Sequence, residues 1–182
     1  AASRIVLHRL HHSTKLPYCA TSHDMTNAFP SSSHDHMHDV IMPDVREVDQ
    51  EFVSQRREGS VVALETSDGV VYGVLGSGGM MGCSRAVRDF LQCFHATLFR
   101  WQVVMHMVNR PLHLKCPVTG ELVDTGIYTF VDDILKIHVL NHTSADDAAR
   151  AMKYSNQVLD LELQLDGYRQ NTGKQELIAN LR

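Results

Sequence analysis

The sequence lacks any apolar run that approaches the roughly 20 residues needed to cross a bilayer. Its start also lacks the pattern of a secretory signal peptide, because Arg4, His8 and Arg9 interrupt the short apolar pieces. We therefore expect an intracellular protein, of the nucleus or cytoplasm, with no membrane partner. The four cysteines form no Cys-x-x-Cys pair, which argues against a zinc ribbon and against a disulfide framework.

An excess of positive charge is missing as well, since the formal net charge is −4 with histidine neutral. As a sum, this charge argues mildly against a nucleic-acid-binding protein. The two signs are unevenly distributed, however, because residues 1–23 carry Arg4, Arg9 and Lys15 and no acidic residue. A basic segment of this kind can face phosphates even when the total charge is negative.

The chain has 182 residues, of which 43% are hydrophobic, and this is enough for one domain with a core. No repeat, low-complexity tract or linker divides it, so we expect a single domain over residues 1–182. Apolar periodicity and capping residues predict helices over 34–42, over 44–57, from about Ser84 to Val108, and from Ser144 to near Gly167. The third of these is expected to bury a stripe that consists of Val87, Leu91, Phe94, Leu98 and Trp101.

Runs of β-prone residues bounded by turn residues predict the strands. These runs are Tyr18 to Ser22, 60–66 and 70–75 on either side of Ser67-Asp68-Gly69, Ile127 to Val131, Ile134 to Leu140, and Lys174 to Leu181. Pro111 and Pro117 indicate an irregular connection. Helices that interleave with mostly antiparallel strands predict an α+β fold, in which one sheet with two β-hairpins has helices packed on one face.

Two adjacent carboxylates, Asp132 and Asp133, lie at the tip of a predicted hairpin. A turn alone would explain them, because the short Asp side chain bonds nearby backbone. Asp24, however, ends an earlier predicted strand, and a fold that brings it to the hairpin tip would gather three carboxylates. Such a group repels itself without a cation, and oxygen ligands suit Mg²⁺. The three acids are therefore candidates for a two-metal phosphoryl-transfer site.

Four short motifs, in the same order, resemble those of reverse transcriptases. The first resembles the palm motif in which an aromatic residue follows an Asp by five positions, the second a Gly-containing motif before a helix, the third aromatic-x-Asp-Asp, and the fourth Gly-…-Asn-x-x-Lys-x-Glu. In this sequence they are Asp24 to Ser31, Gly79 to Ser84, Phe130 to Asp133, and Gly167 to Ile178. The long interval between the first and third motifs resembles the interval in the reverse transcriptases of non-LTR, LINE-like retroelements.

The resemblance implies a ferredoxin-like palm domain with part of the fingers and without a helical thumb. It also implies an RNA-directed DNA polymerase that uses an RNA template, a DNA primer and dNTPs. Two Mg²⁺ ions, for which Mn²⁺ can substitute, would be bound by Asp24, Asp132, Asp133 and the backbone carbonyl of Met25. Lys174 would lie near the β- and γ-phosphates as a charge partner and proton donor.

The resemblance further implies a nucleotide-binding set composed of Met25, Phe29, Met81 and Gly82. Phe29 would lie under the sugar of the incoming nucleotide, where a flat ring leaves no room for a 2′-hydroxyl group. Gly82 would allow the backbone to approach the nascent base pair closely.

The sequence departs from the family pattern at two positions. Met81 stands where the family usually has Gln, and a thioether cannot replace the amide donor and acceptor. Pro30 stands where the family often has a small polar residue. Without a thumb, we expect this piece alone to polymerise weakly or not at all. Two alternatives stay open: a degenerate, inactive retroelement copy with the same fold, and a non-enzymatic α+β interaction domain whose Asp-Asp hairpin is only a turn.

Overall fold

The structure is a computed structural model, and it describes residues 7, 8, 12, 16–79, 85–108, 111–140 and 144–181. Its backbone divides into two compact units. The first consists of Ala1–Met25, Arg100–Glu162 and Gln170–Arg182, and the second of Thr26–Phe99 and Leu163–Arg169. The expected single palm domain with partial fingers is not tested by this division and stays a prediction.

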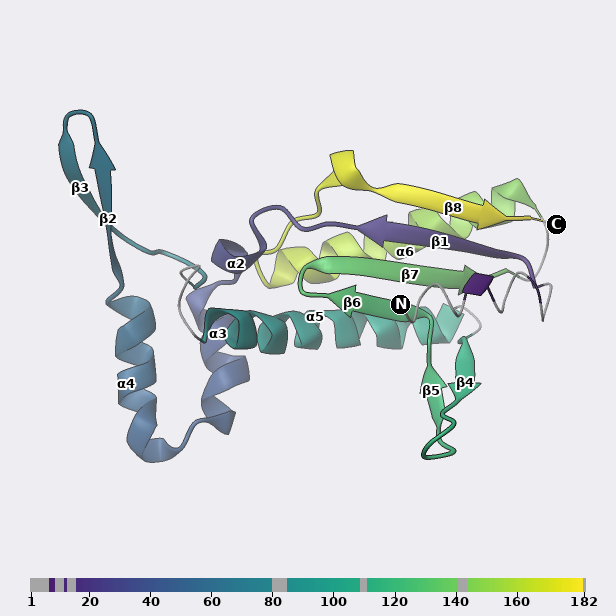
Figure 1. The fold of residues 1–182 in the computed structure, drawn as a ribbon, viewed down its shortest axis with the longest axis horizontal. Coiled ribbons are helices and arrows are strands. Elements are labelled where there is room, and N and C mark those ends of the chain that lie inside the picture. The colour runs from purple at the N-terminus through teal and green to yellow at the C-terminus, as the bar shows by residue number, and fades with distance from the viewer. Residues whose placement is uncertain are drawn as a thin grey trace. The chain divides into compact units, whose positions relative to one another are not determined.

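The first unit is built on a four-stranded antiparallel sheet whose strand order is β6-β7-β1-β8 (Figure 1). Its strands are β1 (Tyr18–His23), β6 (Ile127–Phe130), β7 (Asp133–Val139) and β8 (Glu176–Asn180). The two central strands are β7 and β1, and Ala20 of β1 lies between Ile137 and Ile178. The predicted hairpin of β6 and β7 is confirmed, as is the α+β class with an antiparallel sheet.

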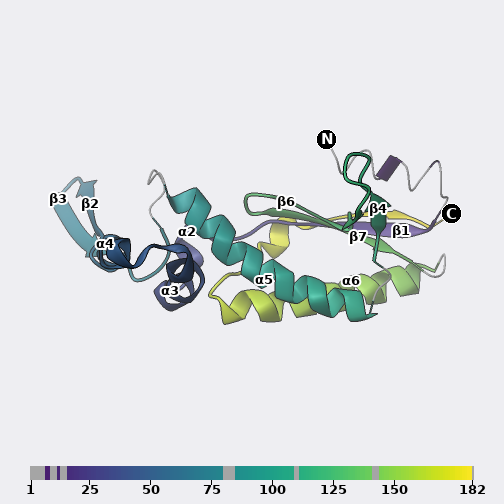
Figure 2. The same cartoon turned by 90° about the horizontal axis from the view of Figure 1, so that it is seen from below.

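The two faces of this sheet have different coverings. On one face, Tyr18, Ala20, Ile137 and Val139 form an apolar cluster. On the other face, Cys19 packs with Ala148 and Met152 of α6 (Ala145–Leu165), and Figure 2 shows α6 along that face. The alternation of β1 thus sends every second side chain toward the helices.

Trp101 is at the centre of the contact between the helices and the sheet. It lies in the C-terminal part of α5 (Ala86–Val108) and is fully buried. Its ring lies edge-on to His23 at a centroid distance of 6.2 Å, and the Nζ atom of Lys136 is 5.9 Å from its centroid. Its Nε1–H group donates a hydrogen bond to the backbone oxygen of Ser155 at 3.1 Å.

The second unit contains residues 26–99 and 163–169. Its elements are α2 (Ala28–Ser31), α3 (His34–Ile41), α4 (Glu47–Glu58), the hairpin of β2 (Val61–Thr66) and β3 (Gly69–Val74), and the N-terminal part of α5. Ser33 caps α3 by accepting a hydrogen bond from the backbone N–H of His36 at 3.1 Å, as its position predicts. Phe90, Phe94 and Tyr168 form an aromatic cluster.

Three sequence-based expectations were wrong in detail. The connection around Pro111 and Pro117 is a short hairpin of β4 (His113–Lys115) and β5 (Leu122–Asp124), whose strands are too short to show alternation. Val87 and Leu91 are 48% and 40% exposed, because the buried stripe of α5 runs through Phe90 and Cys93 instead.

The last strand also begins later than expected. Lys174 lies in a 3₁₀ turn, Thr172–Lys174, and β8 begins at Glu176.

In the described part of the chain, no helix is both long and apolar enough to cross a membrane. The predicted cellular compartment stays a prediction.

His138 is a buried polar residue on the helix-facing side of the sheet. It is 2% exposed, and neither ring nitrogen has a hydrogen-bond partner among the residues that the structure describes. Burial, reinforced by the charges of Lys136 and His23, lowers the pKa of His138 from 6.5 to about 3. The side chain is therefore neutral in the folded protein at all but strongly acidic pH.

This lowered pKa predicts a loss of stability in acid. The unfolded chain takes up the proton near pH 6.5 and the folded chain only near pH 3, so the stabilisation is complete above pH 6.5 and declines as the pH falls. Relative to neutral pH, His138 is expected to cost about 2 kcal/mol at pH 5. Urea unfolding of the wild type and of His138→Leu at both pH values measures this. An equal acid-induced loss in the two proteins would contradict the prediction.

Candidate active site

The register of the sheet places Asp24 beside Asp133. His23 pairs with Ile134, so the next position along β1 lies opposite the first residue of β7. Both carboxylates line a cavity of about 490 Å³, together with Ser22, Lys174 and Glu176. The end of β1 and the start of β7 therefore bring together two of the three acids that the sequence singled out.

Asp24 is held by two side chains from the segment that precedes β8. The Nζ atom of Lys174 is 2.9 Å from Asp24 Oδ2, and the Nδ2 group of Asn171 donates to the same oxygen at 3.2 Å. The hydrogen bond to Asp24 and its negative charge raise the pKa of Lys174. The carboxylate thus already faces a cation, which is supplied by the chain itself.

Asp133 lies in an environment of excess negative charge. Partial burial raises its pKa first, and the charges of Asp132 and Asp24 raise it further, although Lys174 opposes them. A divalent cation would relieve this repulsion. In the described part of the chain, no three His, Cys, Asp or Glu side chains are grouped so as to hold a metal ion as they stand. Carboxylate oxygens are suitable ligands for a hard cation, but the described residues do not form a complete set of ligands as they stand.

The hairpin tip differs from the expected Asp-Asp turn. The two turn residues are Val131 and Asp132, and Asp133 already belongs to β7. Val131 has a φ of 59°, a left-handed conformation that is costly for a β-branched residue. Strain of this kind persists where the surrounding structure enforces it, often at functional sites. Asp132 does not line the cavity, and its metal-binding role stays a prediction.

The predicted nucleotide-binding residues fall in three places. Met25 is buried, and its backbone pairs with Gln170 in an isolated antiparallel bridge. Phe29 belongs to the second unit, where its ring lies 4.9 Å from that of Phe90. Met81 and Gly82 lie outside the described residues. The nucleotide-binding role of all four stays a prediction.

Sequence reasoning assigned no role to Asn171. Its backbone N–H donates to the carbonyl of Asp24 at 2.8 Å, in addition to the side-chain bond. The available signal was its place in the Asn-x-x-Lys motif, three residues before Lys174. A backbone and a side-chain contact from one residue could not be foreseen, because both depend on how β1 and the 3₁₀ turn meet.

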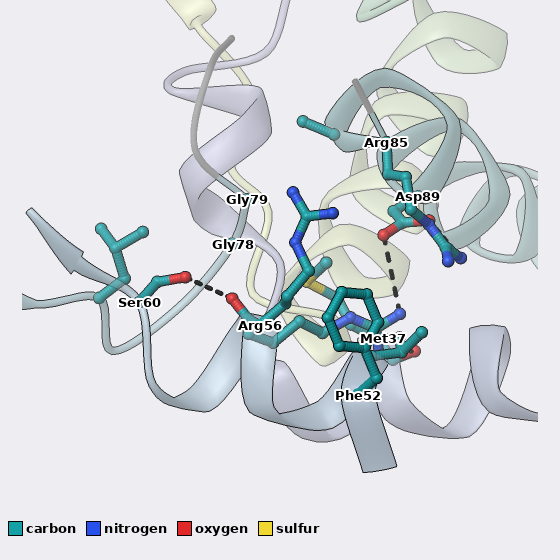
Figure 3. Close-up of a pocket in the computed structure, with 12 residues that line it drawn as sticks. Met37, Phe52, Arg56, Ser60, Gly78, Gly79, Arg85 and Asp89 are labelled. Carbon is teal, nitrogen blue, oxygen red and sulfur yellow. Dashed lines mark hydrogen bonds and ion pairs between the residues drawn. The ribbon is translucent and has the colours of Figure 1, made fainter. Parts of the chain in front are cut away.

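A second cavity, of about 140 Å³, lies in the second unit (Figure 3). Arg57 and Arg85 share the carboxylate of Asp89, at N–O distances of 3.7 and 3.6 Å. Arg57 also donates to the backbone oxygen of Met37 at 3.3 Å. Of the predicted site residues that the structure describes, none lines this cavity, so it is separate from the acidic site.

No family model matches the sequence, and no curated protein matches it either. Solved structures do match. Structures of telomerases are among them. The apo telomerase of Candida tropicalis, truncated from its C-terminal domain, has a TM-score of 0.66 at 16% identity, over 98% of this chain and 34% of that one.

Two RNA complexes are similar to the same extent. Telomerase from Candida tropicalis with a TWJ fragment of telomeric RNA has a TM-score of 0.67 at 16% identity, over 98% of this chain and 29% of that one. Telomerase from Candida albicans with such a fragment has a TM-score of 0.67 at 12% identity, over 97% and 29%. The chain therefore spans about a third of the telomerases it matches.

The chain therefore has the fold of the corresponding part of these telomerases. At this low identity the similarity concerns the fold alone. It agrees with the palm expected from the four motifs. It does not support a non-LTR origin over another one.

Proposed function

We propose that the chain is the palm, with part of the fingers, of an RNA-directed DNA polymerase. The observation that carries this proposal is the placement of Asp24 opposite Asp133, in one cavity with Lys174. The similarity of the fold to that of telomerases also supports the proposal. The substrates would be a DNA primer, an RNA template and dNTPs, and the RNA bound to a similar telomerase supports a nucleic-acid partner.

Two Mg²⁺ ions, or Mn²⁺, would be held by Asp24, Asp132, Asp133 and the carbonyl of Met25. Such ions lower the pKa of a primer 3′-hydroxyl group and stabilise the leaving pyrophosphate. Lys174 is exposed and its pKa is raised, so it stays protonated near neutral pH. It is therefore suited to be a charge partner of the β- and γ-phosphates, and the resemblance also implies that it donates a proton to the pyrophosphate.

A second candidate function is nucleic-acid binding without catalysis, by a decayed copy of a retroelement polymerase. Met81 favours it, because the thioether cannot make the hydrogen bonds of the usual Gln. The non-LTR, LINE-like origin rests on the interval between the first and third motifs. It is part of the same proposal and needs a test of its own.

Primer extension by a polypeptide that carries this chain tests the polymerase proposal. Extension is expected to require dNTPs, an RNA template and a divalent cation, so that EDTA stops it. Asp132→Asn is expected to reduce it strongly, whereas Asp147→Asn, a control in the first turn of α6, is expected to leave it unchanged. Equal extension by wild type and Asp132→Asn would refute the role of Asp132 in catalysis.

A further inference from the structure

Next to Asp24 in the sequence, a chain of hydrogen-bonded polar side chains, which are buried at His23 and Thr21 and partly buried at Gln170 and Asp160, connects α6 to the end of β1. His23 is fully buried, and its Nδ1 atom is 2.7 Å from Oε1 of Gln170. The Nε2 atom of Gln170 is in turn 2.6 Å from Oδ1 of Asp160, on α6. On its other side, His23 Nε2 is 3.0 Å from the hydroxyl of Thr21. None of the four residues lines the acidic cavity.

The chemistry of Asp160 sets the direction of every hydrogen bond in this chain. An ionised carboxylate only accepts, so the amide group of Gln170 must donate to it and must turn its oxygen toward His23. The amide of Gln175 also donates to that oxygen, at 2.7 Å. His23 therefore carries its proton on Nδ1, and its Nε2 accepts from Thr21. Asp160 thus selects one tautomer of His23 through Gln170.

The segment that contains Gln170 also holds Asp24 in place. Gln170 pairs with Met25 in a backbone bridge, and Asn171 contacts both the carbonyl and the carboxylate of Asp24. Lys174, at the end of the same segment, reaches the carboxylate as well. The position of the Asp24 carboxylate thus depends on how the segment from Gln170 to Lys174 packs against the end of β1.

We propose that Asp160, Gln170 and His23 form a positioning clamp that orients the Asp24 carboxylate for divalent-cation binding. The inference rests on the proposed function, since it takes Asp24 to be a metal ligand. A fully satisfied polar network is rigid, whereas apolar residues of the same size would fill the space without defining a direction. Residues that orient a metal ligand without binding the metal themselves typically change the affinity for the metal by about 10–100-fold.

Four variants of the 182-residue chain test the clamp, with Mn²⁺ alone as the probe and free Mn²⁺ measured by electron paramagnetic resonance. Gln170→Met keeps the side-chain length and removes the hydrogen bonds to His23, Asp160 and Gln175, and is expected to raise the Mn²⁺ dissociation constant by roughly 10-fold or more. Gln157→Met, on the exposed side of α6, is the matched control and is expected to bind as the wild type does.

The His23 variants separate positioning from packing. Asn places its amide nitrogen where Nδ1 lies and keeps the donor to Gln170, whereas Gln places it where Nε2 lies and loses that donor. We expect His23→Asn to retain Mn²⁺ affinity and His23→Gln to lose it by a similar factor to Gln170→Met. Since this pair differs little in size, it decides the question even if Gln170→Met unfolds.

The ring ¹⁵N shifts of His23 provide a readout without metal. The Nδ1–H tautomer is expected in the wild type and not in Gln170→Met. If the wild type binds Mn²⁺ and Gln170→Met and His23→Gln bind it equally well, the clamp is overturned and the polymerase proposal stands. If the folded wild type does not bind Mn²⁺ at all, the metal site itself is overturned, and the clamp with it.

Discussion

Asp24→Asn is expected to reduce RNA-templated primer extension by roughly 1,000-fold, because catalytic metal ions contribute several kcal/mol to such reactions. Asp24 lies opposite Asp133, lines the same cavity, and has its carboxylate held by Asn171 and Lys174. An amide keeps the shape of the side chain and can still contact Asn171, but it removes the charge that a cation needs. The rate of extension at saturating dNTP measures the effect.

Asp146→Asn is the matched control, since Asp146 is an exposed acid in the first turn of α6. It makes the same chemical change and is expected to leave extension unchanged. Circular dichroism must show that Asp24→Asn is folded. A folded Asp24→Asn protein that extends primers at the wild-type rate would remove Asp24 from the reaction.

Trp101→Ala is expected to lower the free energy of unfolding by about 4 kcal/mol, in the range for large buried aromatic residues. Trp101 is fully buried between α5 and the sheet, where it contacts His23 and Lys136. Its removal leaves a cavity and deprives the backbone oxygen of Ser155 of a hydrogen-bond donor. It also removes the aromatic ring that lies near the ammonium group of Lys136. The midpoint of urea unfolding is expected to fall by roughly 2 M.

This unfolding is best followed by circular dichroism, because Trp101 is the single tryptophan of the chain. Trp101→Phe retains most of the apolar volume and loses the Nε1–H donor, so it is expected to cost about 1–2 kcal/mol. Leu161→Ala, at a position on α6 that is 64% exposed, is expected to change stability by less than about 0.5 kcal/mol. A similar loss in Leu161→Ala and Trp101→Ala would show that Trp101 is not central to the core.

The parts of the fold that depend on neighbours in sequence could be predicted from it. The helix predicted over 34–42, the hairpin at Asp68 and the helix that contains Trp101 each follow from local patterns, and the structure confirms them. The antiparallel α+β architecture followed from the order of these elements. Local propensity, capping and turn residues decide whether these elements form, so no tertiary contact had to override them.

The parts that depend on tertiary contacts could not. The buried stripe of α5 is rotated away from Val87 and Leu91, because the partners of the helix are distant in sequence. Of the candidate site, the sequence indicated Asp24 and Lys174 but not that they contact each other. The hydrogen bond between His23 and Gln170 joins residues that are 147 positions apart, and no local pattern contains such a contact.

The most direct test of the account is a crystal structure of the chain grown with Mn²⁺, in which the anomalous signal of manganese locates the ion. The account predicts an ion within coordination distance of the carboxylates of Asp24 and Asp133, with Lys174 displaced from Asp24. Mn²⁺ bound only elsewhere, or an unchanged Lys174–Asp24 ion pair with no ion in the cavity at saturating Mn²⁺, would contradict it.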